Sequence, residues 1–264
     1  MDSKYKYKYE VHMHTAQSSA CGKTPAREYI STFKELGYDG IIITDHFFWG
    51  NTAIDRKLPW EDFVEQFCKG YEEAKEEGDK VGLKVFFGWE ACRRPDEYLI
   101  YGPDKAWLKA HPEVRDADHA ELHRIISEAG GLMVGAHPFR ERYYIDKVNL
   151  HPFQCDAWEA SNFGNPPYQD VFTYEYCKKH GIIMTSGTDL HDVNNLKNSP
   201  CGMLFEKPLE SIADYVRVIK SGKGFMPMIC EERRTRTPQM KNERPIMLYN
   251  EKNEGRFVQL NEII

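Results

Sequence analysis

The sequence lacks the long apolar runs, paired cysteine motifs and basic excess that mark several classes of protein. No apolar run approaches the roughly 18 residues that a membrane-spanning helix needs. The N-terminal stretch MDSKYKYKYE is charged and alternating, so we do not expect a signal peptide there. The seven cysteines contain no C-x-x-C pair and are odd in number, which is typical of reduced thiols in a cytoplasmic protein.

The charge balance is mildly acidic. A formal net charge of −6 argues against a surface built to lie along nucleic acid, although it leaves room for a local basic pocket that binds a small anion. The 264 residues are 41% hydrophobic and 29% charged, which is typical of a globular protein that buries a sizeable core without disulfides. The sequence does not indicate an oligomeric state.

Short apolar runs alternate with helix-like segments along most of the chain. Strands are expected at 9–13, 40–44, 84–89, 99–102, 131–136, 155–160, 181–186 and 224–229, and amphipathic helices at 25–37, 60–77, 117–129, 167–180 and 209–221. Several strand runs are continuously apolar, as in parallel strands that are covered on both faces. This rhythm favours one α/β barrel domain, which we place at residues 1–230.

Residues 231–264 lose the rhythm and are predicted to form an extension packed on the barrel, as a small hairpin or a strap. The extension begins with the basic segment ERRTRTPQMK. Its arginines Arg233, Arg234 and Arg236 could fold back over the mouth of the barrel.

Histidines and carboxylates gather where the expected strands end. In a barrel of parallel strands these ends converge on one mouth, where active sites are assembled. His12 and His14 stand two residues apart on a strand, so their side chains point the same way. Imidazole and carboxylate together suit Mn, Fe or Zn. The sequence therefore predicts a multinuclear metal site, with Glu90 as its candidate bridging ligand. The residues so placed are His12, His14, His46, Glu90, His137, Asp189 and His191.

Other histidines lack this placement. His119 and His123 stand four apart on an expected helix, a spacing that can bind a metal on one face. Because no glutamate follows the first in the H-E-x-x-H manner, we interpret the pair as helix surface. His180 precedes Gly181 and is expected at a helix C-terminus, where its charge suits the helix dipole.

Five short motifs, taken in order, resemble those of the polymerase and histidinol phosphatase (PHP) family. They are HMHT at 12–15, TDH at 44–46, GWE at 88–90, AHP at 136–138 and TDLH at 188–191. Any one motif is weak, but the ordered set is specific, and the resemblance covers residues from about 9 to about 228. It implies a distorted (β/α)7 barrel that binds two or three divalent Mn, Fe or Zn ions and hydrolyses phosphoesters.

The resemblance also implies which residues hold each metal. The first metal would be held by His12, His14, Glu90 and Asp189. The second would be held by Glu90 and His137, and the third by His46 and His191.

Two positions depart from the family pattern. A ligand usually follows the H-x-H by six or seven residues, but Ala20 and Cys21 stand there. Cys21 could ligate zinc or iron as a thiolate, or it could be a buried inert thiol. The second departure replaces a histidine by Glu97 or Asp96, either of which could complete the second metal site. These departures leave the choice between two and three metals open.

A phosphate needs cations besides the metals. Arg140 is expected on the rim of the barrel mouth, where its planar fork could bind a phosphate; a solvated surface side chain is the alternative. Arg93 or Arg94 could reach the same mouth. Glu159 and Asn162 end another strand, and Asn162 could orient the substrate or belong to a turn.

The expected reaction is attack of a metal-activated hydroxide on the phosphorus of a small phosphorylated substrate. We expect Arg140 to stabilise the transferring oxygens, Asp45 to orient an imidazole and His191 to protonate the leaving oxygen. A 3′–5′ exonuclease-like module, hydrolysis of a C–N bond and a non-catalytic metal-binding regulatory domain are the alternatives. The acidic balance argues against the first, and the complete core ligand set argues against the last.

Overall fold

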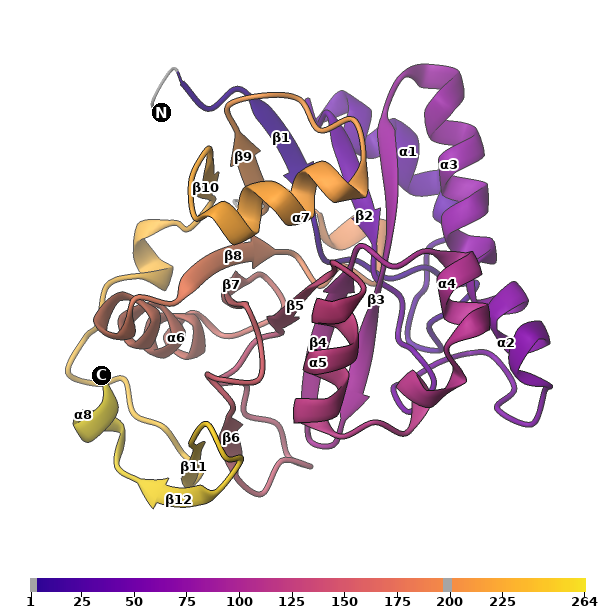
Figure 1. Cartoon of the computed structure of the whole chain (residues 1–264). Coiled ribbons are helices and arrows are strands. Elements are labelled where there is room, and N and C mark those ends of the chain that lie inside the picture. Colours follow the sequence, from indigo (N-terminus) through magenta and orange to yellow (C-terminus); the bar gives the residue numbers. More distant parts are fainter. Residues whose placement is uncertain (1–3, 197–200) are drawn as a thin grey trace.

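The computed structural model describes residues 4–196 and 201–264 as a mixed α/β structure (Figure 1). The strands of its main sheet are β1 (Tyr7–Glu10), β2 (Gly40–Ile43), β3 (Lys84–Arg93), β4 (Asp96–Tyr101), β5 (Leu132–Gly135), β7 (Ala157–Asn162), β8 (Ile183–Gly187), β9 (Met203–Phe205) and β10 (Phe225–Pro227). They follow the order β10-β9-β1-β2-β3-β4-β5-β7-β8. The two ends of the sheet meet where β10 contacts β8, so the sheet forms a nearly closed barrel. The predicted α/β barrel is confirmed.

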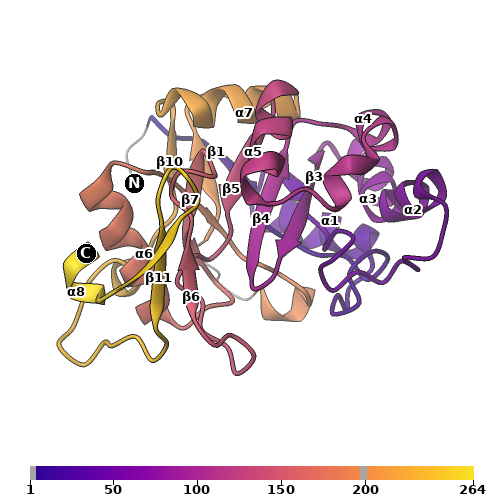
Figure 2. The ribbon, with the colours of Figure 1, turned by 60° about the horizontal axis from the view of Figure 1, so that its bottom comes forward.

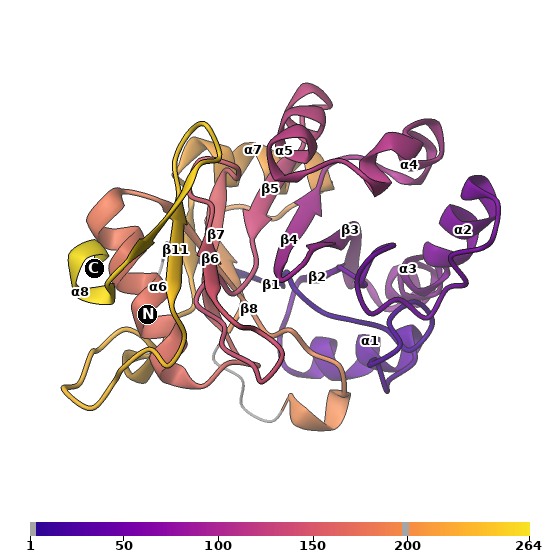
Figure 3. The same ribbon diagram turned by 90° about the horizontal axis from the view of Figure 1, so that it is seen from below.

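Helices surround the barrel on the outside of the strands (Figure 3). They are α1 (Ala26–Glu35), α2 (Trp60–Phe67), α3 (Lys69–Val81), α4 (Lys105–Ala110), α5 (His119–Glu128), α6 (Pro167–His180), α7 (Ile212–Ser221) and the short α8 (Leu260–Ile263). Single 3-10 turns are η1 (Pro112–Arg115), η2 (Val193–Asn195) and η3 (Glu231–Arg233). Within the described residues no helix is long and apolar enough to cross a membrane.

Local sequence signals explain where the elements begin and end. α7 begins with a capping box in which the Ser211 hydroxyl accepts the Asp214 amide, and it ends at Gly222 with φ of 66°. β1 ends early, because the Glu10 carboxylate accepts the amides of Val11 (2.9 Å) and His12 (2.8 Å). These amides therefore cannot donate to a neighbouring strand, and the segment with His12 turns toward the barrel mouth.

The barrel departs from an all-parallel arrangement at β9, which pairs antiparallel with β1 and β10, and at β4, which pairs antiparallel with both β3 and β5. Only Arg94 and Pro95 separate β3 from β4, whereas a parallel connection needs roughly a dozen residues or more. The expected helix over 60–77 is also divided, with Cys68 between α2 and α3.

The C-terminal residues form a hairpin that lies against the barrel (Figure 2). Its strands β11 (Ile246–Tyr249) and β12 (Gly255–Val258) pair antiparallel, and β11 pairs parallel with β6 (Val148–Leu150). Buried apolar side chains of this hairpin and of α8 pack with side chains from β7 and α6.

Candidate metal centre

The predicted metal-ligating side chains converge at the barrel mouth in four overlapping groups. Within each group the ligand atoms lie within 4.8 Å of one another. The groups are His12–His14–Glu90, His12–His137–Asp189, His46–Glu90–Glu97 and His14–His46–His191. Together they contain the seven residues that the sequence placed at the barrel mouth, and Glu97 as the eighth.

Glu90 lies at the centre of these groups. Its carboxylate is buried, and Oε1 lies 3.3 Å from Nε2 of both His12 and His137. Its other oxygen, Oε2, lies 2.5 Å from His46 Nδ1. The two oxygens thus face different imidazoles, as the oxygens of a bridging carboxylate do.

Buried polar atoms of the centre lack ordinary hydrogen-bond partners. Despite their short separation, His46 Nδ1 and Glu90 Oε2 do not have hydrogen-bond geometry, and neither has another partner among the described residues. The Nε2 atoms of His12 and His14 face each other at 3.3 Å. Leaving buried polar atoms unpaired is costly, and a divalent cation between them removes that cost. The donor set therefore fits metal ions.

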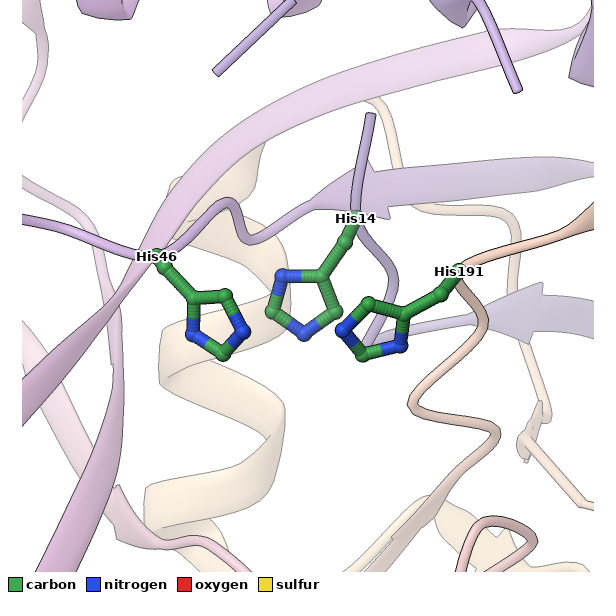
Figure 4. Close-up of side chains that lie close together, drawn as sticks. All are labelled: His14, His46 and His191. Atoms are coloured by element: carbon green, nitrogen blue, oxygen red, sulfur yellow. The ribbon is translucent and has the colours of Figure 1, made fainter. Parts of the chain in front are cut away.

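His14, His46 and His191 lie next to one another at one side of the centre (Figure 4). The His14 ring lies 4.2 Å from the ring of His46 and 4.2 Å from that of His191. The Cys21 thiol lies beside this group: burial raises its pKa, but hydrogen bonds with His191 and His46 dominate and lower it to about 6. The thiol thus lies beside these imidazoles rather than in an apolar interior.

Electrostatic interactions keep two carboxylates of the centre ionised. Burial alone would raise the pKa of Glu90, but His46 and the other imidazoles hold it well below its usual range. In the same way, Arg140 and His12 outweigh burial and hold the pKa of Asp189 well below its usual range. Burial and the nearby Glu90 charge instead raise the pKa of Glu97 to about 7.

Glu159 on β7 orients the first imidazole. Its Oε1 lies 2.8 Å from His12 Nδ1, and its Oε2 accepts the His137 amide at 3.1 Å. The His12 Nδ1–H therefore donates to a carboxylate and directs Nε2 toward Glu90, which is the usual support of a metal-binding histidine.

Asp45 braces His14 indirectly and does not reach the ligand atoms itself. Its carboxylate accepts the Thr15 amide (2.6 Å), the Thr15 hydroxyl (2.7 Å) and the Ser19 hydroxyl (2.7 Å). Ser19 Oγ lies 3.2 Å from His14 Nδ1. Asp45 therefore orients an imidazole through Ser19, and that imidazole belongs to His14.

Two ligand positions have left-handed backbone conformations. His137 has φ of 35° and Asp189 has φ of 54°. Such conformations cost of the order of 1–3 kcal/mol each for a non-glycine residue. Hydrogen bonds hold both residues in place, from the His137 amide to Glu159 and from the Asp189 amide to the His12 carbonyl (2.8 Å).

Arg140 lies beside the centre and is held by three acceptors. Its Nη2 lies 2.5 Å from Asp189 Oδ2 and 3.0 Å from Asn162 Oδ1, and its Nε donates to Asn165 Oδ1 at 2.7 Å. Asn162 in turn donates to Glu159 Oε2 at 2.8 Å. The asparagine therefore orients protein groups of the site.

A cavity of about 780 Å³ opens from the centre, a size suited to a small-molecule ligand. Its polar lining includes Glu97, His137, Arg140, Arg94 and Lys147. Arg93 does not share it: the Arg93 guanidinium donates to the carbonyls of Cys92 (2.8 Å) and Val114 (2.7 Å).

Some residues of the site carry no recognisable signal in the sequence. Ser19 and Asn165 act through hydrogen bonds to residues of other segments, so no local spacing indicates them. Glu159 stands near the end of the strand expected at 155–160, which is the one usable signal, although β7 itself continues to Asn162.

The fold and the site define an α/β barrel protein whose mouth is built to bind metals. The chain belongs to the PHP domain family, whose model matches residues 10–223. No curated protein matches the chain.

Three solved structures share the fold at 15–19% sequence identity. A two-domain protein from Bacteroides vulgatus, containing a predicted PHP-like metal-dependent phosphoesterase, aligns with a TM-score of 0.62 over 85% of this chain and 65% of its own. A candidate metal-dependent phosphoesterase from Bifidobacterium adolescentis aligns with a TM-score of 0.50 over 82% and 96%. An amidohydrolase from Chromobacterium violaceum with bound sulfate aligns with a TM-score of 0.50 over 85% and 99%. The chain therefore spans about two thirds of the first of these proteins.

Proposed function

We propose that this protein is a metal-dependent hydrolase of a small-molecule phosphoester. The observation that carries the proposal is the buried Glu90 carboxylate between His12, His137 and His46, in a chain of the PHP family. Two or three divalent ions (Mn, Fe or Zn), when bound by the predicted ligands, would activate water and neutralise charge on a phosphoryl group. The protein itself has to bind and orient the ester beside these ligands.

Arg140 is suited to bind the phosphoryl oxygens. Its guanidinium lines the cavity next to His137. Among the described residues its hydrogen bonds use Nε and Nη2, which leaves Nη1 for an oxygen of the substrate. The similar Chromobacterium violaceum structure holds sulfate, a tetrahedral oxyanion like phosphate. Arg94 and Lys147 line the same cavity and would attract a phosphorylated compound.

His191 is better suited to hold a metal than to protonate the leaving oxygen. Its Nδ1 lies 2.7 Å from the main-chain carbonyl of Asp189, to which it donates. The neutral ring then carries a lone pair on Nε2, as a metal ligand requires. We therefore assign His191 to the group of His14 and His46.

The proposal extends to the size of the substrate and to the location of the protein. A cavity of this size favours a small phosphorylated molecule over a nucleic acid. Among the described residues no disulfide joins the cysteines, which supports the cytoplasmic location expected from the sequence.

The test is a phosphatase screen of purified protein that has been stripped by a chelator and reloaded separately with Mn, Zn or Fe(II). We expect release of phosphate, or cleavage of a diester, in at least one metal form, and loss of turnover in the Glu90→Gln variant. Glu76→Gln, which changes an exposed glutamate of α3, is the matched control and should keep full activity. No turnover of any phosphoester in any metal form would refute the proposal.

A further inference from the structure

A second cluster of potential ligands lies outside the centre described above. Neighbouring residues of β4 point to opposite sides of the strand: Glu97 faces His137, whereas Asp96 faces His119 and His151. We propose that Asp96, His119 and His151 bind a further divalent transition metal, zinc in the first place, between the barrel and the C-terminal hairpin.

The separations of the ligand atoms suit a tetrahedral ion. Asp96 Oδ2 lies 3.1 Å from His119 Nε2 and 3.5 Å from His151 Nε2. Zinc bonds of roughly 2.0–2.2 Å to nitrogen and oxygen place tetrahedral ligands roughly 3.3–3.6 Å apart. The separations from Asp96 therefore fit one ion, to which the His119 ring has to turn. All three potential ligand atoms lie within 4.8 Å of one another.

An unpaired acceptor stands beside the cluster. Asn149 Nδ2 lies 3.3 Å from Asp96 Oδ2, while the buried Oδ1 of the same amide has no hydrogen-bond partner among the described residues. Rotation of this amide by half a turn brings Oδ1 to the Asp96 side. That arrangement repels the carboxylate when no cation is present, but it completes an N2O2 ligand set around a cation.

His151 is hydrogen-bonded through its second ring nitrogen, as metal-binding histidines usually are. Its Nδ1 lies 3.1 Å from Asn253 Oδ1, so this nitrogen carries the donated hydrogen. In a neutral ring, Nε2 then turns a lone pair toward Asp96 Oδ2, which is itself an acceptor. A proton or a metal ion between these two buried atoms (the His151 side chain is 4% exposed) removes their repulsion, and a count of bound metal ions distinguishes the two.

One ring has to turn for both imidazoles to aim at a single ion. The His119 and His151 rings are stacked at 4.2 Å with 12° between their planes, and a metal lies in the plane of each ring that binds it. His119 is the ring that can turn, because it is the first residue of α5 and its side chain is 19% exposed. His151 is fixed on its other face by the Tyr249 ring, 3.9 Å away.

The cluster lies at the junction with the C-terminal hairpin. Tyr249 ends β11 and Asn253 belongs to the turn before β12, and both contact His151. Asp96 and His151 also line the cavity that opens from the main centre. An ion at this place would join α5, β4 and the residue after β6 that contacts the hairpin, so its removal should loosen the packing of the hairpin.

The experiment counts metal ions in the full-length protein after chelator treatment and reloading with excess Co²⁺ or Zn²⁺, followed by gel filtration. We expect His119→Gln and Asp96→Asn each to bind one ion fewer per chain than the unaltered protein. His123→Gln, one turn further along α5, is the matched control and should keep the full count. The thermal midpoint should rise on reloading by less in His119→Gln than in His123→Gln.

The count does not depend on phosphoester turnover, so its result stands apart from the proposed function. Far-UV circular dichroism shows whether each variant folds. If either His119→Gln or Asp96→Asn fails to fold, the metal count of the other variant tests the site. If folded His119→Gln or Asp96→Asn binds as many ions as the unaltered protein, the second metal site does not exist.

Discussion

Arg233 of the C-terminal extension and Asp170 of α6 form a buried ion pair in which Nη1 lies 2.6 Å from Oδ2. The same Nη1 donates to the carbonyls of Asn162 (2.7 Å) and Asn165 (3.2 Å). The Asp170 carboxylate accepts the Asn162 amide (2.9 Å) and the Asn165 side chain (3.0 Å). Both asparagines also accept hydrogen bonds from Arg140. The extension therefore positions this arginine of the barrel mouth through Asn162 and Asn165.

Arg233→Met should weaken both the fold and the site. The buried Asp170 carboxylate would lose its cationic partner, and removing one partner of a buried ion pair costs about 3–5 kcal/mol. We expect a lower thermal midpoint and a higher KM for the phosphoester, because Arg140 loses its support. Arg234→Met, at the exposed neighbouring position, is the control. Equal midpoints for the two variants would exclude the bracing role of Arg233.

Arg140→Lys should retain the charge but lose the planar fork that contacts Asp189, Asn162 and Asn165. Removing one donor that stabilises transition-state charge typically lowers kcat by about 100–1000-fold, and we expect a loss of this order in kcat/KM. The measurement is steady-state phosphate release. The same substitution at the exposed Arg124 should change nothing. A loss of less than threefold at position 140 would remove Arg140 from the substrate site.

Glu159→Gln should weaken metal binding without removing a ligand. The amide can no longer accept the His12 Nδ1–H as a carboxylate does, so the imidazole becomes less basic and less well oriented. Changes of such supporting groups typically cost 10–100-fold in metal affinity. Competition with a fluorescent chelator measures the affinity, with Glu76→Gln as control. Unchanged affinity would show that Glu159 serves only the fold.

The free energy of unfolding should depend on pH through Asp156, which joins β5 to the neighbouring helices. Burial alone would raise the pKa of Asp156, but hydrogen bonds from His123 and the Met133 amide, with Lys220 nearby, lower it below its ordinary value. A lowered pKa in the folded state stabilises the protein above the unfolded pKa of about 3.9, and this contribution is lost as the pH falls through the folded pKa. Denaturant titrations between pH 6 and acid should show a smaller decline for Asp156→Asn. Parallel declines for the two proteins would contradict this.

The order of ligands along the chain predicts most of the metal centre, because the ends of parallel strands converge without any knowledge of packing. His12 and His137 follow this rule, whereas Glu90 lies inside β3, which continues to Arg93 in antiparallel pairing with β4. The choice between Asp96 and Glu97 could not be made, since it depends on which face of an antiparallel strand meets the centre. Pairing of Ala91 with Tyr98 and of Cys92 with Glu97 sets that register.

Other features depend on contacts between distant segments. Arg93 follows Glu90 closely, yet its guanidinium binds the Val114 carbonyl instead of reaching the mouth. His119 and His123 were expected on the helix surface, but both are partly buried, and each faces a carboxylate from another strand or loop. No spacing along one helix reveals such partners. Arg233 contacts residues that lie more than 60 positions away.

The central claim is that the barrel mouth holds metal ions, and anomalous diffraction from crystals of the reloaded protein tests it most directly. Data collected on both sides of the absorption edge of the loaded metal locate each ion. The account predicts at least two anomalous peaks within bonding distance of His12, His14, Glu90, His137 and Asp189, with Glu90 touching both. A map from fully loaded crystals without a peak among these residues would contradict it.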